Sequence, residues 1–304
     1  MNRKLNGIKA PPIKIQGIKT KLVPFIMHSV KWDGEGKWVE PFLGSGVVAL
    51  NVNPERALLA DTNQHIINFY RAIQDGIMNS YDLRCFLEKE GKLLKEKGQD
   101  HYYELRERFN DQHSPFDFIF LNRACFNGMM RFNSKGGFNV PFCRKPERFA
   151  QAYVTKICNQ VAWAADRIKG KDWQFVVQDW RKTLHQVENR DFVYLDPPYN
   201  DRHTDYYNQW KDTDADGLAL EVKQLKACFA YSTWKQNKYR TNEHLTKHFS
   251  DFPTATKEHF YHVGSKESLR NAMEEALVMS PNCVAEQEKN SMLPKFQEQF
   301  AIAF

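Results

Sequence analysis

The sequence predicts an α/β protein whose parallel sheet carries a ligand site at the carboxyl ends of its strands. Residues 37–61 read as strand, glycine-rich loop, helix and second strand, with Glu40 ending the first strand and Asp61 the second. Residues 192–199, Phe-Val-Tyr-Leu-Asp-Pro-Pro-Tyr, begin as a buried strand and must leave the sheet at Asp196, because two prolines cannot donate ladder hydrogen bonds. Ligands of open α/β sheets bind at this edge.

Composition is that of a folded globular chain of one or two domains. The protein has 304 residues, of which 42% are apolar, and a net charge of +6, a weak sign of a polyanionic partner. It contains no apolar run of the ~18 residues needed to span a bilayer, and its N-terminus does not resemble a signal peptide. The six scattered cysteines argue against a zinc site or a disulfide framework, which favours a cytoplasmic protein. The ten histidines show no metal-ligand spacing, so we expect structural or surface roles and no metal.

Hydrophobic periodicity and turn residues predict the other elements. We expect Thr20 to cap a helix and residues 200–216 to form a mobile loop over the site, with a polar tail at 284–304. The helices are predicted at 21–30, 47–52, 63–74, within 79–113, and at 116–126, 151–168 and 216–226. The strands are predicted at 37–40, 58–61, 173–177, 192–195, 228–232 and 276–279, with a hairpin arm at 260–263.

The glycine loop indicates a nucleoside cofactor. Residues 44–49 match the pattern G-x-G-x-x-A, and Asp61 lies 17 positions after Gly44, the spacing of an acid that binds ribose hydroxyls. A glycine turn required only for packing gives the same pattern. Glu40, just before the loop, would repel a pyrophosphate but suits a cation, which favours S-adenosylmethionine, since this cofactor has an ammonium, a sulfonium and no phosphate.

The stiff turn after the last of these strands has the groups needed to hold an amine. The Asp196 carboxylate and the Pro197 carbonyl are both acceptors and together could bind the two protons of an amino group. Tyr199 could stack on a flat ring beside them. An ordinary surface turn remains the alternative for this tetrapeptide taken alone.

Residues 127–145 have the composition of a segment that touches nucleic acid. The stretch contains glycines, amides, aromatics and four basic residues, but no acid. Cations suit phosphates and amides suit base edges. The candidate contacts here are Asn127, Arg131, Asn133, Lys135, Asn139, Arg144 and Lys145.

Taken in order, these motifs resemble the adenine-specific DNA methyltransferases of the D12 class, the α group that includes the Dam-type enzymes. The resemblance runs from about Ile13 to Pro281, and one segment departs from the family pattern. The family usually has Lys-Trp-Ala-Gly-Gly-Lys where residues 14–19 read Lys-Ile-Gln-Gly-Ile-Lys, which suggests a subgroup that accompanies a restriction system. The matching segments are residues 38–46 (cofactor loop), 60–63 and 67–70 (ribose binding), 122–123, 126–128 and 138–142 (target recognition) and 196–199 (catalysis).

The resemblance implies a fold, a reaction and a set of site residues. It implies a seven-stranded, Rossmann-like S-adenosylmethionine-dependent methyltransferase core from residues 1–75 and 170–304, with an inserted, mainly helical target-recognition domain at 76–169. The substrate would be duplex DNA, whose adenine is flipped out and methylated on N6, in a bacterium or phage with a cognate restriction endonuclease. The implied catalytic residues are Asp196, Pro197 and Tyr199; the implied cofactor contacts are Ile15, Gly17, Lys19, Glu40, Pro41, Phe42, Gly44, Gly46, Asp61, Asp179 and Asp196; and Arg123 joins the DNA contacts above.

Two other functions stay open. An RNA base methyltransferase can carry a similar turn, but more than a hundred residues separate Asp61 from the strand at 192–195, which favours DNA and a recognition domain of its own. A nicotinamide-dependent oxidoreductase shares the glycine pattern but not the flanking Glu40.

Overall fold

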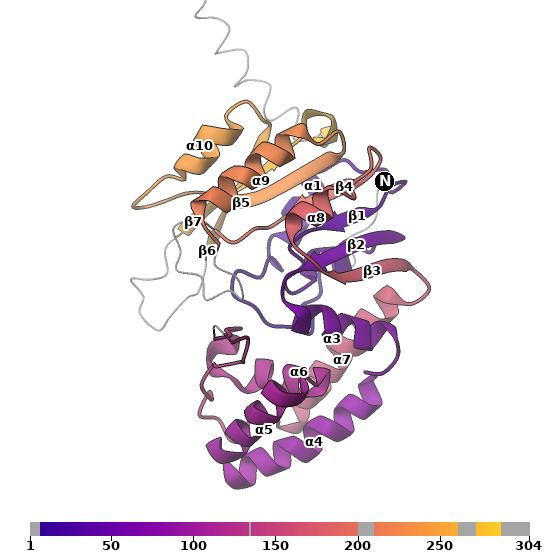
Figure 1. The fold of residues 1–304 in the computed structure, drawn as a ribbon, viewed down its shortest axis with the longest axis vertical. Coiled ribbons are helices and arrows are strands. Elements are labelled where there is room, and N and C mark those ends of the chain that lie inside the picture. The colour runs from indigo at the N-terminus through magenta and orange to yellow at the C-terminus, as the bar shows by residue number, and fades with distance from the viewer. Residues whose placement is uncertain (1–6, 134, 200–209, 261–271, 287–304) are drawn as a thin grey trace, which may run out of the picture.

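The computed structural model describes residues 7–133, 135–199, 210–260 and 272–286. Its centre is one seven-stranded sheet in the order β3-β2-β1-β4-β5-β7-β6 (Figure 1). Neighbouring strands from β3 to β5 pair in parallel, whereas β7 is antiparallel to both of its neighbours. The predicted α/β class and seven-stranded sheet are therefore confirmed. The strands are β1 (Trp38–Glu40), β2 (Arg56–Asp61), β3 (Asp172–Val177), β4 (Phe192–Leu195), β5 (Cys228–Asn237), β6 (Thr254–Phe260) and β7 (Ala272–Met279).

The strand order reverses between β1 and β4. The chain moves outward from β1 through β2 to β3 on one side, and from β4 to β5 on the other. At such a switch point the loops after the two central strands diverge and leave a crevice. Glu40 ends β1, and Asp196 directly follows β4, so both carboxyl groups stand at this crevice.

Helices cover both faces of the sheet, because alternate strand residues point in opposite directions. Trp38 of β1 belongs to one apolar cluster and the next residue, Val39, to the other. The first cluster includes residues of α1 and α3, and the second those of α9. The helices of this core are α1 (Val23–Ser29), α2 (Val47–Val52), α3 (Gln64–Gln74), α8 (Trp180–Leu184), α9 (Asp212–Gln224) and α10 (Glu243–Phe249), with a short 3-10 turn η3 (Pro281–Cys283).

Between β2 and β3 the chain inserts a group of helices that lies beyond α3, away from the sheet (Figure 1). Their buried side chains, such as Leu87, Phe109 and Phe118, belong to the same apolar cluster as α3, so the inserted helices share one core with that side of the sheet. The charged stretch at 79–113 is two helices, separated at Gly98, whose φ of 61° is unfavourable for other residues. The inserted elements are α4 (Ser80–Lys97), α5 (Gln99–Gln112), α6 (Pro115–Ala124), the 3-10 turn η1 (Phe126–Gly128) and α7 (Gln151–Ile168).

Two local expectations were wrong, and two helices were not predicted. Leu22, not Thr20, precedes α1, and the predicted elements include neither α8 nor α10. β6 begins at Thr254, upstream of the predicted hairpin arm, and residues 261–263 lie outside the described residues. Cys228 and Cys283 form a disulfide, although their separation of 55 residues carries no sequence signal.

The predicted loop at 200–216 and the predicted tail at 284–304 fall largely outside the described residues. Of the predicted loop at 200–216, residues 200–209 are not described, and α9 already begins at Asp212. Most of the predicted polar tail, residues 287–304, is also outside the described part. Across the described ranges, no helix is long and apolar enough to cross a membrane.

Candidate active site

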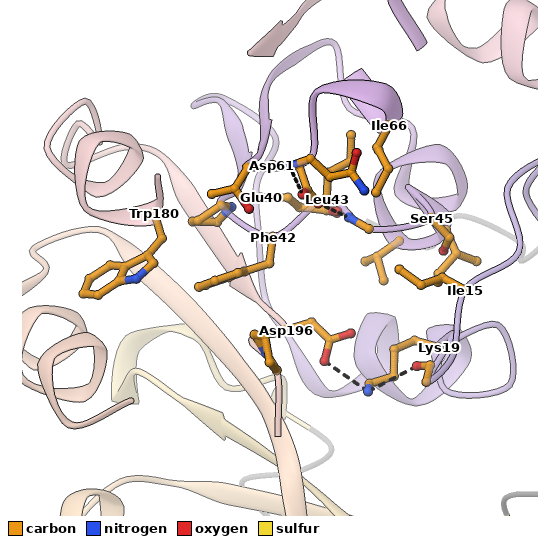
Figure 2. A pocket seen from close by; sticks show the side chains of 18 of the residues that line it. Ile15, Lys19, Glu40, Phe42, Leu43, Ser45, Asp61, Ile66, Trp180 and Asp196 are labelled. Carbon is orange, nitrogen blue, oxygen red and sulfur yellow. Dashed lines mark hydrogen bonds and ion pairs between the residues drawn. The ribbon is translucent and has the colours of Figure 1, made fainter. Parts of the chain in front are cut away.

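A cavity of about 300 Å³ opens at the switch point between β1 and β4. Its walls come from the N-terminal segment, the loop after β1, the end of β2 and the turn after β4, segments far apart in sequence. In Figure 2, Asp61 stands on one side of the cavity, Lys19 and Asp196 stand on the other, and the ring of Phe42 points toward Trp180. Predicted cofactor and catalytic residues therefore share one cavity.

Asp61 is held at the end of β2 by the glycine loop. Its Oδ2 accepts from the backbone N–H of Gly44 at 2.8 Å, and its Oδ1 accepts from that of Asn63 at 2.9 Å. Burial raises the pKa of this carboxyl group, and the backbone donors oppose the rise. Each carboxylate oxygen can accept more than one hydrogen bond, so Asp61 is oriented to receive hydroxyl groups from the cavity.

Gly46 has a packing role. It does not line the cavity, and a Cβ at this position would lie 3.0 Å from the hydroxyl of Tyr70. That hydroxyl donates to the carbonyl of Ser45 at 2.5 Å, so α3 holds the backbone of the glycine loop in place. The structure gives Gly46 a role in supporting the loop, and its expected cofactor contact stays a prediction.

Glu40 is a buried acid in the cavity wall. Its Oε1 accepts from the indole N–H of Trp38 at 2.7 Å. Burial raises the pKa of Glu40 to about 8, and the nearby charge of Asp196 adds to this rise. With such a pKa the side chain is mainly protonated at neutral pH, and a cation bound beside it would favour the ionised form.

Asp196 follows β4 and pairs with a lysine from the N-terminal segment. The Nζ of Lys19 lies 3.0 Å from Asp196 Oδ1, and the two side chains are 3% and 23% exposed. Burial raises the pKa of Asp196, and the ion pair with Lys19 lowers it. Lys19 therefore helps to keep a poorly solvated carboxylate ionised at the edge of the cavity.

The same lysine connects Asp196 to Tyr199. Lys19 Nζ donates to the Tyr199 hydroxyl at 2.7 Å and lies 4.6 Å from the centroid of its ring. The Tyr199 hydroxyl in turn donates to Oε2 of Glu275 in β7 at 2.6 Å. Glu275 is almost fully buried, and among the described residues its Oε1 has no hydrogen-bond partner. These contacts orient Tyr199 from two sides, with one lysine close to two acids.

Sequence reasoning missed Glu275 and Trp180, and it placed Trp210 only within a loop expected over the site. Two adjacent acids, Glu274 and Glu275, interrupt the otherwise apolar strand 272–279, and they were the available signal for Glu275. Trp180 and Trp210 both line the cavity, and Trp210 packs edge-on against Phe42 at a centroid distance of 5.6 Å. Their spacing in sequence gives no indication of this, because they lie on two different connections of the fold.

The other predicted cofactor residues fall at the cavity, and the catalytic turn contributes Asp196 to its wall. Pro197 is buried and Pro198 contributes to the wall. Asp179 also caps α8, where it accepts from the backbone N–H of Arg181 at 2.9 Å. The remaining predicted lining residues found there are Ile15, Gly17, Pro41 and Phe42.

The predicted DNA contacts divide by exposure. Arg131 and Asn139 are half-buried, and the Nε of Arg131 donates to Oδ1 of Asn139 at 3.0 Å. Arg123 is buried in α6, where its guanidinium donates to the Pro12 carbonyl and to Gln160, so it is removed from the candidate DNA contacts. The exposed members are Asn127, Asn133, Lys135, Arg144 and Lys145.

The sheet order, with its antiparallel β7, and a cavity at the switch point define the class of α/β methyltransferase folds. The family model of the D12 class N6 adenine-specific DNA methyltransferases matches residues 16–275, so the chain belongs to this family.

Proteins similar in sequence to this chain are named as DNA methyltransferases. A DNA adenine methylase of Serratia marcescens is 34% identical over 199 residues, which cover 62% of this chain and 68% of that protein. A DNA adenine methylase of Haemophilus influenzae is 34% identical over 53% of this chain, and the match spans only 54% of that relative's length. The type II methyltransferase M.MjaIII of Methanocaldococcus jannaschii is 28% identical, with 62% of this chain and 68% of that protein covered.

Proposed function

We propose that the protein transfers a methyl group from S-adenosylmethionine to the N6 amine of adenine in duplex DNA. The observation that carries the proposal is the meeting of the Asp196 turn and the Asp61–Gly44 pair at one cavity. The Asp61–Gly44 pair suits the ribose of a nucleoside, and the Asp196 turn suits an amine.

The chemistry of the cavity fits this cofactor. Asp61 would accept from the ribose hydroxyls, and the buried Glu40 would face a cationic ammonium. Phe42 and Trp180 supply apolar and aromatic surface for the adenine ring. A pyrophosphate would meet the carboxyl groups of Glu40 and Asp61 instead of a set of cations, which disfavours a dinucleotide.

The chain itself would position and polarise the target amine. Asp196 and the Pro197 carbonyl would accept its two N–H bonds and favour a pyramidal nitrogen whose lone pair faces the cavity. Lys19 would keep Asp196 ionised as an acceptor, and Glu275 would fix the hydroxyl of Tyr199 so that its ring can stack on the base. When bound, the sulfonium supplies an already activated methyl group. Positioning and a preorganised polar site then account for the acceleration.

The position of Asp196 in the cavity wall implies that the target base is flipped out of the duplex. The amine of a paired adenine lies inside the duplex, whereas Asp196 is only 23% exposed at a cavity edge. The nucleotide would have to leave the stack to reach it.

We assign sequence choice to residues 76–169. The exposed residues Asn127, Asn133, Lys135, Arg144 and Lys145 lie in this insert, outside the cavity wall. Backbone-contacting cations should weaken binding to all DNA and flatten its salt dependence when removed. The block at 138–142 packs into the helical core, where the Tyr102 hydroxyl donates to the Val140 carbonyl at 2.7 Å, so its loss should affect folding and catalysis more than sequence preference.

A domain exchange with a D12 enzyme of different target tests this division. The hybrid should methylate the sequence preferred by the donor of residues 76–169. Methylation of the core donor's sequence would place recognition elsewhere.

We further propose that the protein accompanies a restriction endonuclease that recognises the same DNA site. It is supported by the divergent residues 14–19 and by the type II name of the Methanocaldococcus relative. Sequencing of modified DNA from an expressing host would identify the methylated site. Resistance of that DNA to an endonuclease with the same site would support the pairing, and full sensitivity would count against it.

Ligand binding separates the main proposal from its alternatives. S-adenosylhomocysteine should raise the melting temperature and NAD should not; the reverse result would indicate an oxidoreductase. Methyl transfer to duplex DNA but not to RNA of the same sequence would separate the DNA enzyme from an RNA base methyltransferase.

A further inference from the structure

A group of metal-ligand side chains lies outside the cavity, where α9 meets α10. From their geometry we propose that Asp216, His244 and His248 form a binding site for a divalent transition metal of the zinc type. One ligand atom from each residue lies within 4.8 Å of the other two. None of the three residues lines the cavity, so the site is separate from the proposed methyl-transfer site.

The two histidines share one face of α10 because they are four residues apart on a helix. Their ring centroids are 4.6 Å apart. This is the spacing by which helical histidine pairs bind zinc. The sequence analysis expects structural or surface roles for both histidines, because no metal-ligand spacing is seen there. Their position on one helix face is visible only in the structure.

Asp216 of α9 completes the set. Its Oδ1 lies 2.7 Å from His248 Nε2 and 3.3 Å from His244 Nδ1. Ligand bonds to zinc of about 2.0–2.1 Å require ligand atoms about 3.4 Å apart in a tetrahedron. The Asp216–His244 distance already matches this value, and the Asp216–His248 distance would lengthen by about 0.7 Å. The two ligand nitrogens, which are no more than 4.8 Å apart, would have to lie at a similar separation.

Burial favours this site over an ordinary surface ion pair. The side chains of His244 and His248 are only 11% and 8% exposed, whereas that of Asp216 is 39% exposed, which leaves a route for the ion and a water ligand. The nitrogen of His244 that faces Asp216 is Nδ1, whereas its Nε2 is buried and has no hydrogen-bond partner among the described residues. Two imidazoles and one carboxylate suit zinc, cobalt and nickel.

One cation competes with the ion. Lys247 Nζ lies 2.8 Å from Asp216 Oδ2, and its side chain is 62% exposed. Such a long, solvated side chain can turn away at little cost. Removing Lys247 should therefore strengthen metal binding, whereas removing a ligand should weaken it, and this contrast identifies the site.

A bound ion would join α9 to α10 beside the sheet. Two residues before Asp216 on α9, Asp214 lines the cavity and pairs with Arg181 of α8 at 2.9 Å. The inferred role of the ion is a structural clamp on the helix that carries this part of the cavity wall.

Titration of the chelator-treated full chain with zinc sulfate, followed by calorimetry, tests the site. One ion per chain should bind, and cobalt should produce visible ligand-field absorption of a four-coordinate site. His248→Gln and Asp216→Asn should each weaken binding about tenfold or more, since even the partners that only orient metal ligands are worth 10–100-fold. Lys247→Met should bind at least as tightly as the natural protein.

His185→Gln, an exposed histidine that ends α8, is the matched control and should bind unchanged. Circular dichroism and S-adenosylhomocysteine binding check that each variant is folded. Absence of saturable binding to the natural protein, or equal affinity of the folded Asp216→Asn and His248→Gln variants, would overturn the assignment.

Discussion

Replacing Glu40 by glutamine would remove the acid whose pKa is raised to about 8 from 4.5 by burial. Between these two pH values the folded protein holds a proton that the unfolded chain has lost. The free energy of unfolding therefore falls as pH rises from about 4.5 to 8. At about 1.4 kcal/mol per pH unit, this one group lowers the stability of the ligand-free protein by up to about 5 kcal/mol across that window.

Glutamine keeps an oxygen for the Trp38 indole but adds a buried N–H₂ donor, which costs about 1–3 kcal/mol if unsatisfied. At pH 5, where Glu40 is mainly neutral, Glu40→Gln should be equal to the natural protein or less stable. At pH 8 the variant should be more stable by about 2 kcal/mol or more. The free energies of unfolding of the two proteins, plotted against pH, should therefore cross. The crossing shows that Glu40 is protonated in the folded protein, because the other groups titrate alike in both proteins.

Urea denaturation at several pH values measures this difference, with Glu55→Gln as a control at an exposed glutamate. S-adenosylhomocysteine binding measured on the same samples should weaken about tenfold or more, since hydrogen bonds to charged groups are worth about 1.5–3 kcal/mol. A difference in stability that stays constant from pH 5 to 8 would show that Glu40 is already ionised in the folded protein and would refute the reasoning.

Three other substitutions test separate parts of the site. Asp61→Ala should weaken S-adenosylhomocysteine binding by about 1.5–3 kcal/mol with little change in DNA affinity, and an unchanged calorimetric constant would make Asp61 a strand-end residue only. Lys19→Met should move the acidic limb of the pH–rate profile to higher pH, because Lys19 lowers the pKa of Asp196; an unmoved limb would contradict this coupling. Glu275→Ala should reduce kcat, but not further when Tyr199→Phe is already present, because both act through one hydrogen bond; additive losses would separate them.

The local sequence predicted most of the sheet. The strands that end in Glu40 or Asp61, and the one that Asp196 follows, combine buried apolar runs with abrupt polar or proline stops. It also predicted α2 and α7 with the residue limits that the structure shows. Short α8 and α10 were missed, since five and seven residues are too few for a helical period to stand out.

The candidate site was predicted only where its residues belong to motifs. Lys19 was expected at the cofactor, but its contacts with Asp196 and Tyr199 join segments about 180 residues apart. Arg123 was misassigned because composition does not distinguish a buried guanidinium from an exposed one. Glu275 reaches the site only through the pairing of β7 with β5, a long-range arrangement that a single sequence does not state.

Transfer of a labelled methyl group from S-adenosylmethionine to duplex DNA, followed by mass spectrometry of the released nucleosides, tests the central claim most directly. The natural protein should form N6-methyladenine and no methylcytosine. Folded Asp196→Ala should lose about 10²-fold or more in rate while S-adenosylhomocysteine still raises its melting temperature. Methylation of another base, or near-normal turnover by Asp196→Ala, would contradict the account.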